Sequence, residues 1–186
     1  MNKTNAHTQI IEKAQQGDQL AFRKLYDQYK HSLFMVCLRY AKDRSTAQDY
    51  LQDAFINIFR NLNQFDPTRG VFESWAKRVT VNICLGDIRK NTLYAVNITR
   101  AEQVESKEIS ILSELSLQEM MALIQELPYG YRTVFNMYVI DGFSHKEIAA
   151  ELNISTITSR SQLMKARKML QKIILNNQLT YSRDHG

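Results

Sequence analysis

Apolar residues recur at helical spacing along most of the chain, and they divide its first half into three expected helices. Asp18 can cap the first helix, because an aspartate side chain accepts hydrogen bonds from the first backbone N–H groups. Ser45 and Gln48 have the spacing of a capping box, which predicts the start of the second helix. The third helix is expected from about Val71 to Lys90. The pattern therefore predicts a helical first domain.

The periodicity fades between Thr92 and Leu115, where no aromatic residue follows Tyr94 and the net charge falls to −2. Such a stretch is typical of a flexible linker. The chain has only 6 Gly and 2 Pro, fewer than a sheet protein with many tight turns needs. We therefore predict an all-α fold with two small helical domains. The expected parts are an N-terminal segment (1–17), a first domain (18–91), a linker (92–115), a second domain (116–176) and a C-terminal tail (177–186).

Helical spacing resumes after the linker with two short elements. Ser116, with Glu119 at the capping-box position, is expected to start the first of them. Pro128 is expected to start the next, since proline is well tolerated at the beginning of a helix. Gly142 can end that helix in a left-handed conformation.

The next stretch has the pattern of a helix-turn-helix motif. Ser144 and Glu147 form a capping box for a short helix, and Asn153 can adopt the left-handed conformation that ends it. Ser155 can then cap a final helix that runs to about Leu175. The second helix of such a motif can enter the major groove of DNA.

The final helix carries five basic residues between Ser155 and Lys172 and no acidic residue that would repel phosphates. A helical wheel places Ser159, Leu163, Ala166, Leu170 and Ile173 on the face that packs inward. The residues expected to contact DNA are Thr158, Arg160, Ser161, Gln162 and Lys165. Glutamine can read adenine, whereas lysine can meet a phosphate. The alternative is an ordinary helical hairpin with a solvated basic face.

Composition narrows the chemistry further. The formal net charge of +5 suits a nucleic-acid partner, although many proteins without one share it. Cys37 and Cys84 are expected to be buried free thiols, because a structural zinc site needs four close ligands. The four histidines are scattered, so we predict no metal site, no cofactor and no enzymatic activity. The longest apolar run, Leu33 to Leu38, is too short to cross a bilayer, which predicts a cytoplasmic protein.

Three stretches together resemble the extracytoplasmic-function (ECF) sigma factors, the smallest members of the bacterial sigma-70 family. They are AQDYLQDAFINIFRNLNQFD (Ala47 to Asp66), FESWAKRVTVNICLGDIRK (Phe72 to Lys90) and LPYGYRTVFNMYVIDGFSHKEIAAELNISTITSRSQLMKARKML (Leu127 to Leu170). The resemblance implies a sigma factor that directs RNA polymerase to promoters. Its partners would be core RNA polymerase, promoter DNA and an anti-sigma factor, often membrane-bound in the family, with no small-molecule substrate. The rival interpretation is a conventional helix-turn-helix regulator whose first half binds a ligand or dimerises.

The first domain carries two polar stripes that this resemblance explains. The first stripe lies opposite the apolar face of the second helix and contains two acids and an isoleucine that we expect to be exposed. Its residues are Asp49, Gln52, Asp53 and Ile56. In the family, this helix docks on core polymerase. The loop and helix around the second stretch would capture an unstacked −10 base. The residues assigned to that role are Arg69, Arg78, Asn82 and Arg89.

The resemblance likewise assigns the helix-turn-helix to the −35 element. This chain departs from the family there, because Ser159 and Gln162 replace the common Val and Arg of the final helix. The −35 sequence that it prefers is therefore left open.

Overall fold

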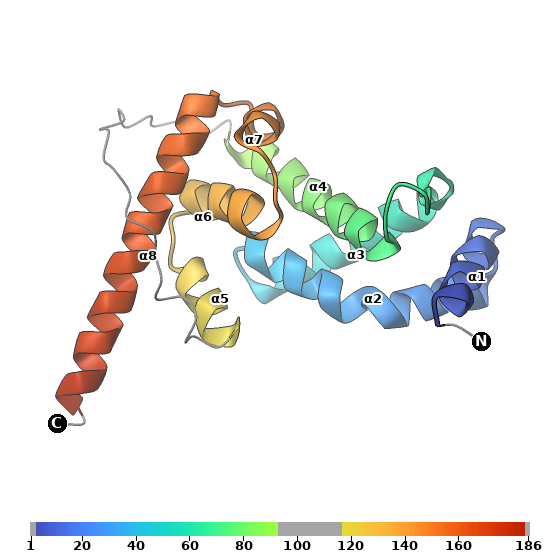
Figure 1. Ribbon diagram of the computed structural model, residues 1–186, viewed down its shortest axis with the longest axis horizontal. Helices are drawn as coiled ribbons and strands as arrows, with labels where there is room; N and C mark the ends of the chain where they lie inside the picture. Colours follow the sequence, from blue (N-terminus) through green and yellow to red (C-terminus); the bar gives the residue numbers. More distant parts are fainter. Residues whose placement is uncertain (1–2, 93–116, 185–186) are drawn as a thin grey trace. The chain divides into compact units, whose positions relative to one another are not determined.

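The computed structural model describes residues 3–92 and 117–184, with side chains described from 6 to 86 and from 119 to 176. These residues form helices joined by turns, and neither range contains a strand (Figure 1). The chain divides into two compact units, Met1–Ile88 and Arg89–Gly186. The expected all-α fold is confirmed. The predicted linker and the capping residue Ser116 lie almost wholly outside the described residues.

The described helices keep the order expected from the sequence, with helix α1 added before them and the final helix extended. The first unit contains α1 (Lys3–Gln15), α2 (Gln19–Tyr40), α3 (Arg44–Arg60), the 3₁₀ turn η1 (Leu62–Gln64) and the start of α4 (Phe72–Thr92). The second contains α5 (Leu117–Gln125), α6 (Tyr129–Phe135), the π-helical turn η3 (Asn136–Ile140), α7 (His145–Leu152) and α8 (Thr156–Asp184). Within the described ranges, no helix is both long and apolar enough to cross a membrane.

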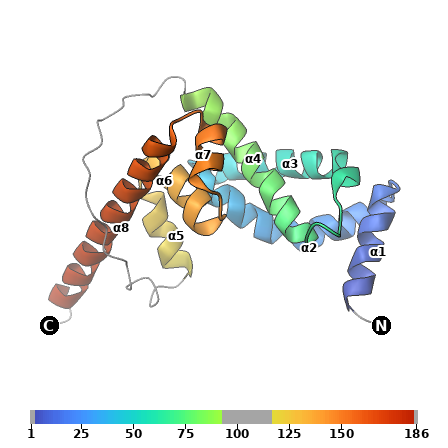
Figure 2. The ribbon, with the colours of Figure 1, turned by 45° about the horizontal axis from the view of Figure 1, so that its top comes forward.

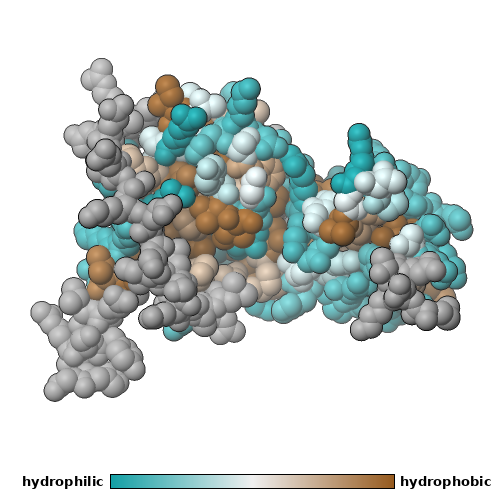
Figure 3. Space-filling view, viewed as in Figure 1, coloured by the Kyte–Doolittle hydropathy of each residue, from teal (hydrophilic) through white to brown (hydrophobic). Residues whose placement is uncertain are grey.

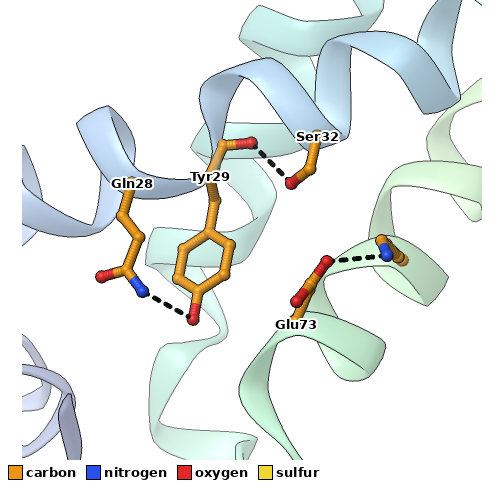
Figure 4. Close-up of polar contacts among 5 residues, drawn as sticks. Gln28, Tyr29, Ser32 and Glu73 are labelled. Carbon is orange, nitrogen blue, oxygen red and sulfur yellow. Dashed lines mark hydrogen bonds and ion pairs between the residues drawn. The ribbon is translucent and has the colours of Figure 1, made fainter. Parts of the chain in front are cut away.

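The core of the first unit is an aromatic cluster where α2, α3 and α4 meet. The ring of Phe72 lies 5.1 Å from that of Tyr29 and 5.4 Å from that of Phe65. Figure 4 shows how the polar atoms of Tyr29 are satisfied beside this cluster. Its hydroxyl accepts a hydrogen bond from Gln28 at 3.3 Å, and its backbone carbonyl accepts one from Ser32 at 3.1 Å. Aromatic packing of this kind orients α4 against α2.

Helix α1 covers one end of this core, although the sequence pattern assigned no element to residues 1–17. Its Ile11 and Ala14 are buried. His7 shares a hydrogen bond of 2.6 Å with the hydroxyl of Tyr29 on α2. The amide of Gln15 donates to the carbonyl oxygens of residues 62 and 65, at 3.0 and 3.4 Å. Helix α1 is therefore tied to the turn that leads into α4.

The start of α3 corrects one sequence prediction. The N-cap is Asp43, not Ser45, and its carboxylate accepts from the backbone N–H of Thr46 at 2.8 Å. This hydrogen bond lowers the pKa of Asp43. Both residues are good caps two positions apart, and Asp43 has the extended backbone that a cap requires, so the helix begins at Arg44.

The two cysteines meet inside the first unit. Cys37 on α2 and Cys84 on α4 are both buried and free, as the sequence predicted. A hydrogen bond between the two thiols, together with burial, raises the pKa of Cys84 well above its usual value. The pair therefore acts as part of the apolar contact between α2 and α4, because such thiols stay protonated and unreactive.

The second unit is built around α8, which from its beginning contacts α7, α6 and α5 in turn (Figures 1 and 2). Its inward face buries Leu163, Ala166, Leu170 and Ile174, so Ile174 takes the place expected for Ile173. Arg132 of α6 joins α5 to α6, since its guanidinium donates to the carbonyl and side chain of Gln125.

The end of α8 corrects a second prediction. The helix continues to Asp184, whereas the sequence pattern ended it near Leu175 and assigned residues 177–186 to a tail. No Gly or Pro follows Leu175 before Gly186. A helix propagates at one hydrogen bond per residue unless something stops it, and this stretch of sequence contains no strong helix breaker.

Candidate nucleic-acid interface and polymerase-docking surface

The turn between α7 and α8 is closed by the local interactions that the sequence predicted. The Ser144 hydroxyl accepts from the backbone N–H of Glu147 at 3.2 Å, and the Glu147 carboxylate accepts from the backbone N–H of Ser144 at 2.8 Å. Asn153 is left-handed, with φ 52° and ψ 47°. The Ser155 hydroxyl then accepts from the backbone N–H of Thr158 at 2.9 Å. The capping box, the left-handed turn and the cap of α8 are confirmed.

A side-chain contact that the sequence did not reveal joins the two helices. Nδ1 of His145, the first residue of α7, lies 2.9 Å from the hydroxyl oxygen of Ser159 on α8. Ser159 is fully buried, and the His145 ring stacks on Tyr138 with centroids 4.4 Å apart. Burial, followed by repulsion from Arg160 and Arg167, lowers the pKa of His145. The imidazole thus satisfies the buried Ser159 hydroxyl.

The residues predicted to contact DNA do not share one orientation on α8. Arg160 is exposed, whereas Thr158, Ser161 and Lys165 are half-buried. Around the helix, Ser161 and Lys165 lie opposite the buried seam, and Arg160 lies at its flank. The Thr158 hydroxyl is engaged with that of Ser155 at 2.8 Å.

Gln162 departs most from the helical-wheel expectation. Gln162 is half-buried beside Gly130 of α6. If Gly130 had a Cβ atom, that atom would lie 3.7 Å from the side-chain oxygen of Gln162, which is van der Waals contact. Its amide therefore leans on α6 rather than pointing away from the unit. The outward position is instead held by Ile157 in the first turn of α8, whose residue surface is 72% exposed. Sequence reasoning missed it because one apolar residue among polar ones carries no periodic signal.

The residues assigned to the −10 element lie on α4 and on the loop before it. Arg69, Arg78 and Asn82 are exposed, and the side chain of Arg89 lies outside the described residues. The loop is shaped by Asp66, whose carboxylate accepts from the backbone N–H and the hydroxyl of Thr68 at 2.9 and 2.7 Å. Arg69 and Arg78 therefore bring positive charge to a loop and to the helix that follows it.

The acidic stripe of α3 borders a groove. All four stripe residues are exposed, and Ile56 is 38% exposed. The groove, of about 730 Å³, lies between α2 and α3 and has Gln52 and Ile56 in its wall. Its floor is aromatic, and Arg44 lies over the ring of Phe34 at 5.2 Å. The aromatic residues that line it are Tyr26, Phe34, Phe55 and Phe59. The sequence did not reveal this groove because its lining comes from two helices, and the pattern of one helix does not show how a second helix packs beside it.

Comparison with known proteins matches both units to one family. Residues 25–93 match the model of sigma-70 region 2, and residues 117–170 match the model of sigma-70 region 4. The ECF RNA polymerase sigma-E factor of Escherichia coli is 33% identical over 181 residues, covering 87% of this chain and 90% of that protein. The RNA polymerase sigma-H factor of Pseudomonas aeruginosa is 30% identical over 186 residues, covering 89% and 92%.

The fold is also found in a solved structure, the sigma factor RpoE of Bartonella quintana in complex with the anti-sigma factor NepR. It is 19% identical and covers 82% of this chain and 96% of that one, with a TM-score of 0.50. The resemblance seen in three sequence stretches is thus confirmed over nearly the whole chain. This chain belongs to the ECF RNA polymerase sigma factors of the sigma-70 family, the subunits that direct transcription initiation at promoters.

Proposed function

We propose that the second unit reads the −35 element through α8, while the first unit docks on core polymerase through α3 and opens the −10 element through α4. The observation that carries this proposal is the helix-turn-helix formed by α7 and α8. Its second helix is capped at Ser155 and carries only basic charges as far as Lys172. A helix with that charge pattern suits the major groove, where nearby phosphates attract it.

Within α8, the first turns would meet base edges and later residues would meet phosphates. We assign Arg160 and Ser161 to base edges, because they lie near the helix N-terminus and outside the buried seam. Gln162 would reach a base only at the margin of the interface, since its amide lies beside Gly130. Lys165 lies one turn further and would contact a phosphate, and Thr158 would support the first turn.

In the first unit, we assign Arg69, Arg78, Asn82 and Arg89 to the −10 strand. Extruding a base from the stack costs a few kcal/mol, and contacts to the strand must offset that cost. The exposed guanidinium groups of Arg69 and Arg78 supply phosphate contacts, and the exposed amide of Asn82 supplies donors and an acceptor for a base.

The remaining assignments concern protein partners. The stripe of Asp49, Gln52, Asp53 and Ile56, with the groove beside it, offers acidic and apolar contacts to core polymerase. We further propose that an anti-sigma factor covers these surfaces, as the Bartonella sigma factor was solved with one. The polymerase would supply all catalysis. The protein would work in the bacterial cytoplasm, where polymerase and chromosome meet.

The test uses holoenzyme reconstituted from the full chain and core polymerase. Lys165→Ala should weaken binding to all −35 sequences similarly and lower the salt slope of log K by about one unit, because one phosphate contact is lost. Lys42→Ala removes an exposed lysine from the first unit and serves as control. An unchanged salt slope for Lys165→Ala, with binding that ignores the −35 sequence, would refute the assignment of α8.

A further inference from the structure

The most exposed large apolar side chain of the second unit's described residues stands at the beginning of α8. Ile157 is 72% exposed and follows the Ser155 cap by two residues. Figure 3 shows hydrophobic surface at the top of the view, over the beginning of α8. An isolated exposed isoleucine is unremarkable in most proteins. In the first turn of a recognition helix, however, it would stand beside the hydroxyl of Ser161 and the guanidinium of Arg160 at the DNA.

The position of Ile157 on the helix decides what it can reach. It precedes Ser161 by four residues and Lys168 by eleven, so the three lie on one side of α8. That side is opposite the buried seam of Leu163, Ala166 and Leu170. Ile157 therefore points to where the major groove would lie once α8 is docked. It stands in the first turn of α8, the turn that comes nearest to the base edges in such a complex.

Only one base presents an apolar group in the major groove. Thymine carries a 5-methyl group, whereas the other three bases offer hydrogen-bond donors or acceptors that isoleucine cannot use. Burying isoleucine against those polar edges would remove their water without replacing its hydrogen bonds. We propose that Ile157 contacts a thymine methyl group within the −35 element and so selects thymine at that position. The inference rests on the assignment of α8 to the −35 element.

The experiment removes the methyl group without changing any hydrogen bond. Each thymine of the mapped −35 element is replaced in turn by deoxyuridine, and binding of the reconstituted holoenzyme is measured. At one thymine, the wild-type protein should bind about fourfold more weakly after replacement, which corresponds to about 0.8 kcal/mol for one buried CH₂-sized group. The other thymine positions should show no such loss.

The matched variants identify the residue responsible. Ile157→Ala should bind the thymine duplex more weakly than wild type and should no longer distinguish thymine from deoxyuridine at that position. Leu20→Ala removes an apolar side chain that is 71% exposed on the first unit, and it should keep the full methyl dependence. Alanine is a better helix former than isoleucine, so Ile157→Ala should fold normally.

The outcomes separate this inference from the assignment on which it rests. Binding that depends on the −35 sequence but on no thymine methyl group would overturn the role of Ile157 alone. An equal deoxyuridine penalty in Ile157→Ala would do the same, because another residue would then contact the methyl group. Binding that ignores the −35 sequence entirely would overturn the assignment of α8.

Discussion

At the scale of single residues, the contact between His145 and Ser159 joins α7 to α8. His145→Ala should destabilise the second unit by about 1–3 kcal/mol, because it leaves the buried Ser159 hydroxyl without its partner. The double variant His145→Ala, Ser159→Val should recover much of that loss, since no buried hydroxyl remains. Calorimetric unfolding measures both. A double variant no more stable than His145→Ala alone would show that the hydroxyl is satisfied in another way.

The same histidine predicts a pH dependence. Its pKa is lowered from 6.5 in the folded unit, so the unfolded chain binds more protons at mildly acid pH. Stability is therefore fully present above about pH 6.5 and is lost as the pH falls below it. His145→Phe keeps a ring on Tyr138 but cannot be protonated, and should flatten this dependence. Unfolding of the second unit, followed between about pH 7.5 and 5.5, tests the sign.

Trp75 provides an internal control for both experiments. It is the only tryptophan of the chain, and it packs against Phe65 and Phe72 in the first unit. Its fluorescence therefore reports the first unit alone. Substitutions of His145 should leave the tryptophan transition where it is. A parallel shift of that transition would mean that the effect is not confined to the second unit.

At the scale of elements, α1 supports the turn that leads to the proposed −10 surface. Gln15→Ala removes the hydrogen bonds to the carbonyls of Leu62 and Phe65 and should cost about 0.5–1.5 kcal/mol per bond. Hydrogen exchange in residues 62–71 should quicken. Gln16→Ala is the matched control, because Gln16 is exposed and adjacent. Equal exchange in the two variants would mean that α1 does not support this turn.

Helix α3 carries the second prediction at this scale. Asp53→Lys should weaken association with core polymerase, because it reverses one of the two negative charges of the exposed stripe. Stability should change by only about 0.5 kcal/mol, as is usual for a surface substitution. Glu12→Lys reverses an exposed acid on α1 and is the control. If both variants compete equally with wild type for core polymerase, the docking surface does not include Asp53.

The elements also show what the sequence could predict. Caps are local, so Asp18, the Ser144 box and Ser155 were recognisable from residues three or four positions apart. Helix α1 was not, since it is held by contacts with residues 22 to 50 positions away. The orientation of Gln162 depends on Gly130 of another helix, and a wheel for a single helix cannot include that neighbour. The groove beside α3 likewise needs two helices.

At the scale of the whole molecule, each unit would carry one half of promoter recognition under the proposed function. The first unit would bring an acidic stripe to the polymerase and cations to the melted strand. The second would bring a helix free of acids as far as Lys172 to duplex DNA. This proposed division would explain why a formal net charge of only +5 suffices, because the acidic and basic residues would serve different surfaces.

The most direct test of this account is transcription in vitro from genomic DNA by core polymerase, with and without the full chain. We predict new transcripts only when the chain is present, and start sites that share two sequence elements upstream. Altering either shared element should abolish the transcript. Start sites that are the same without the chain, or that share a single element, would contradict the account.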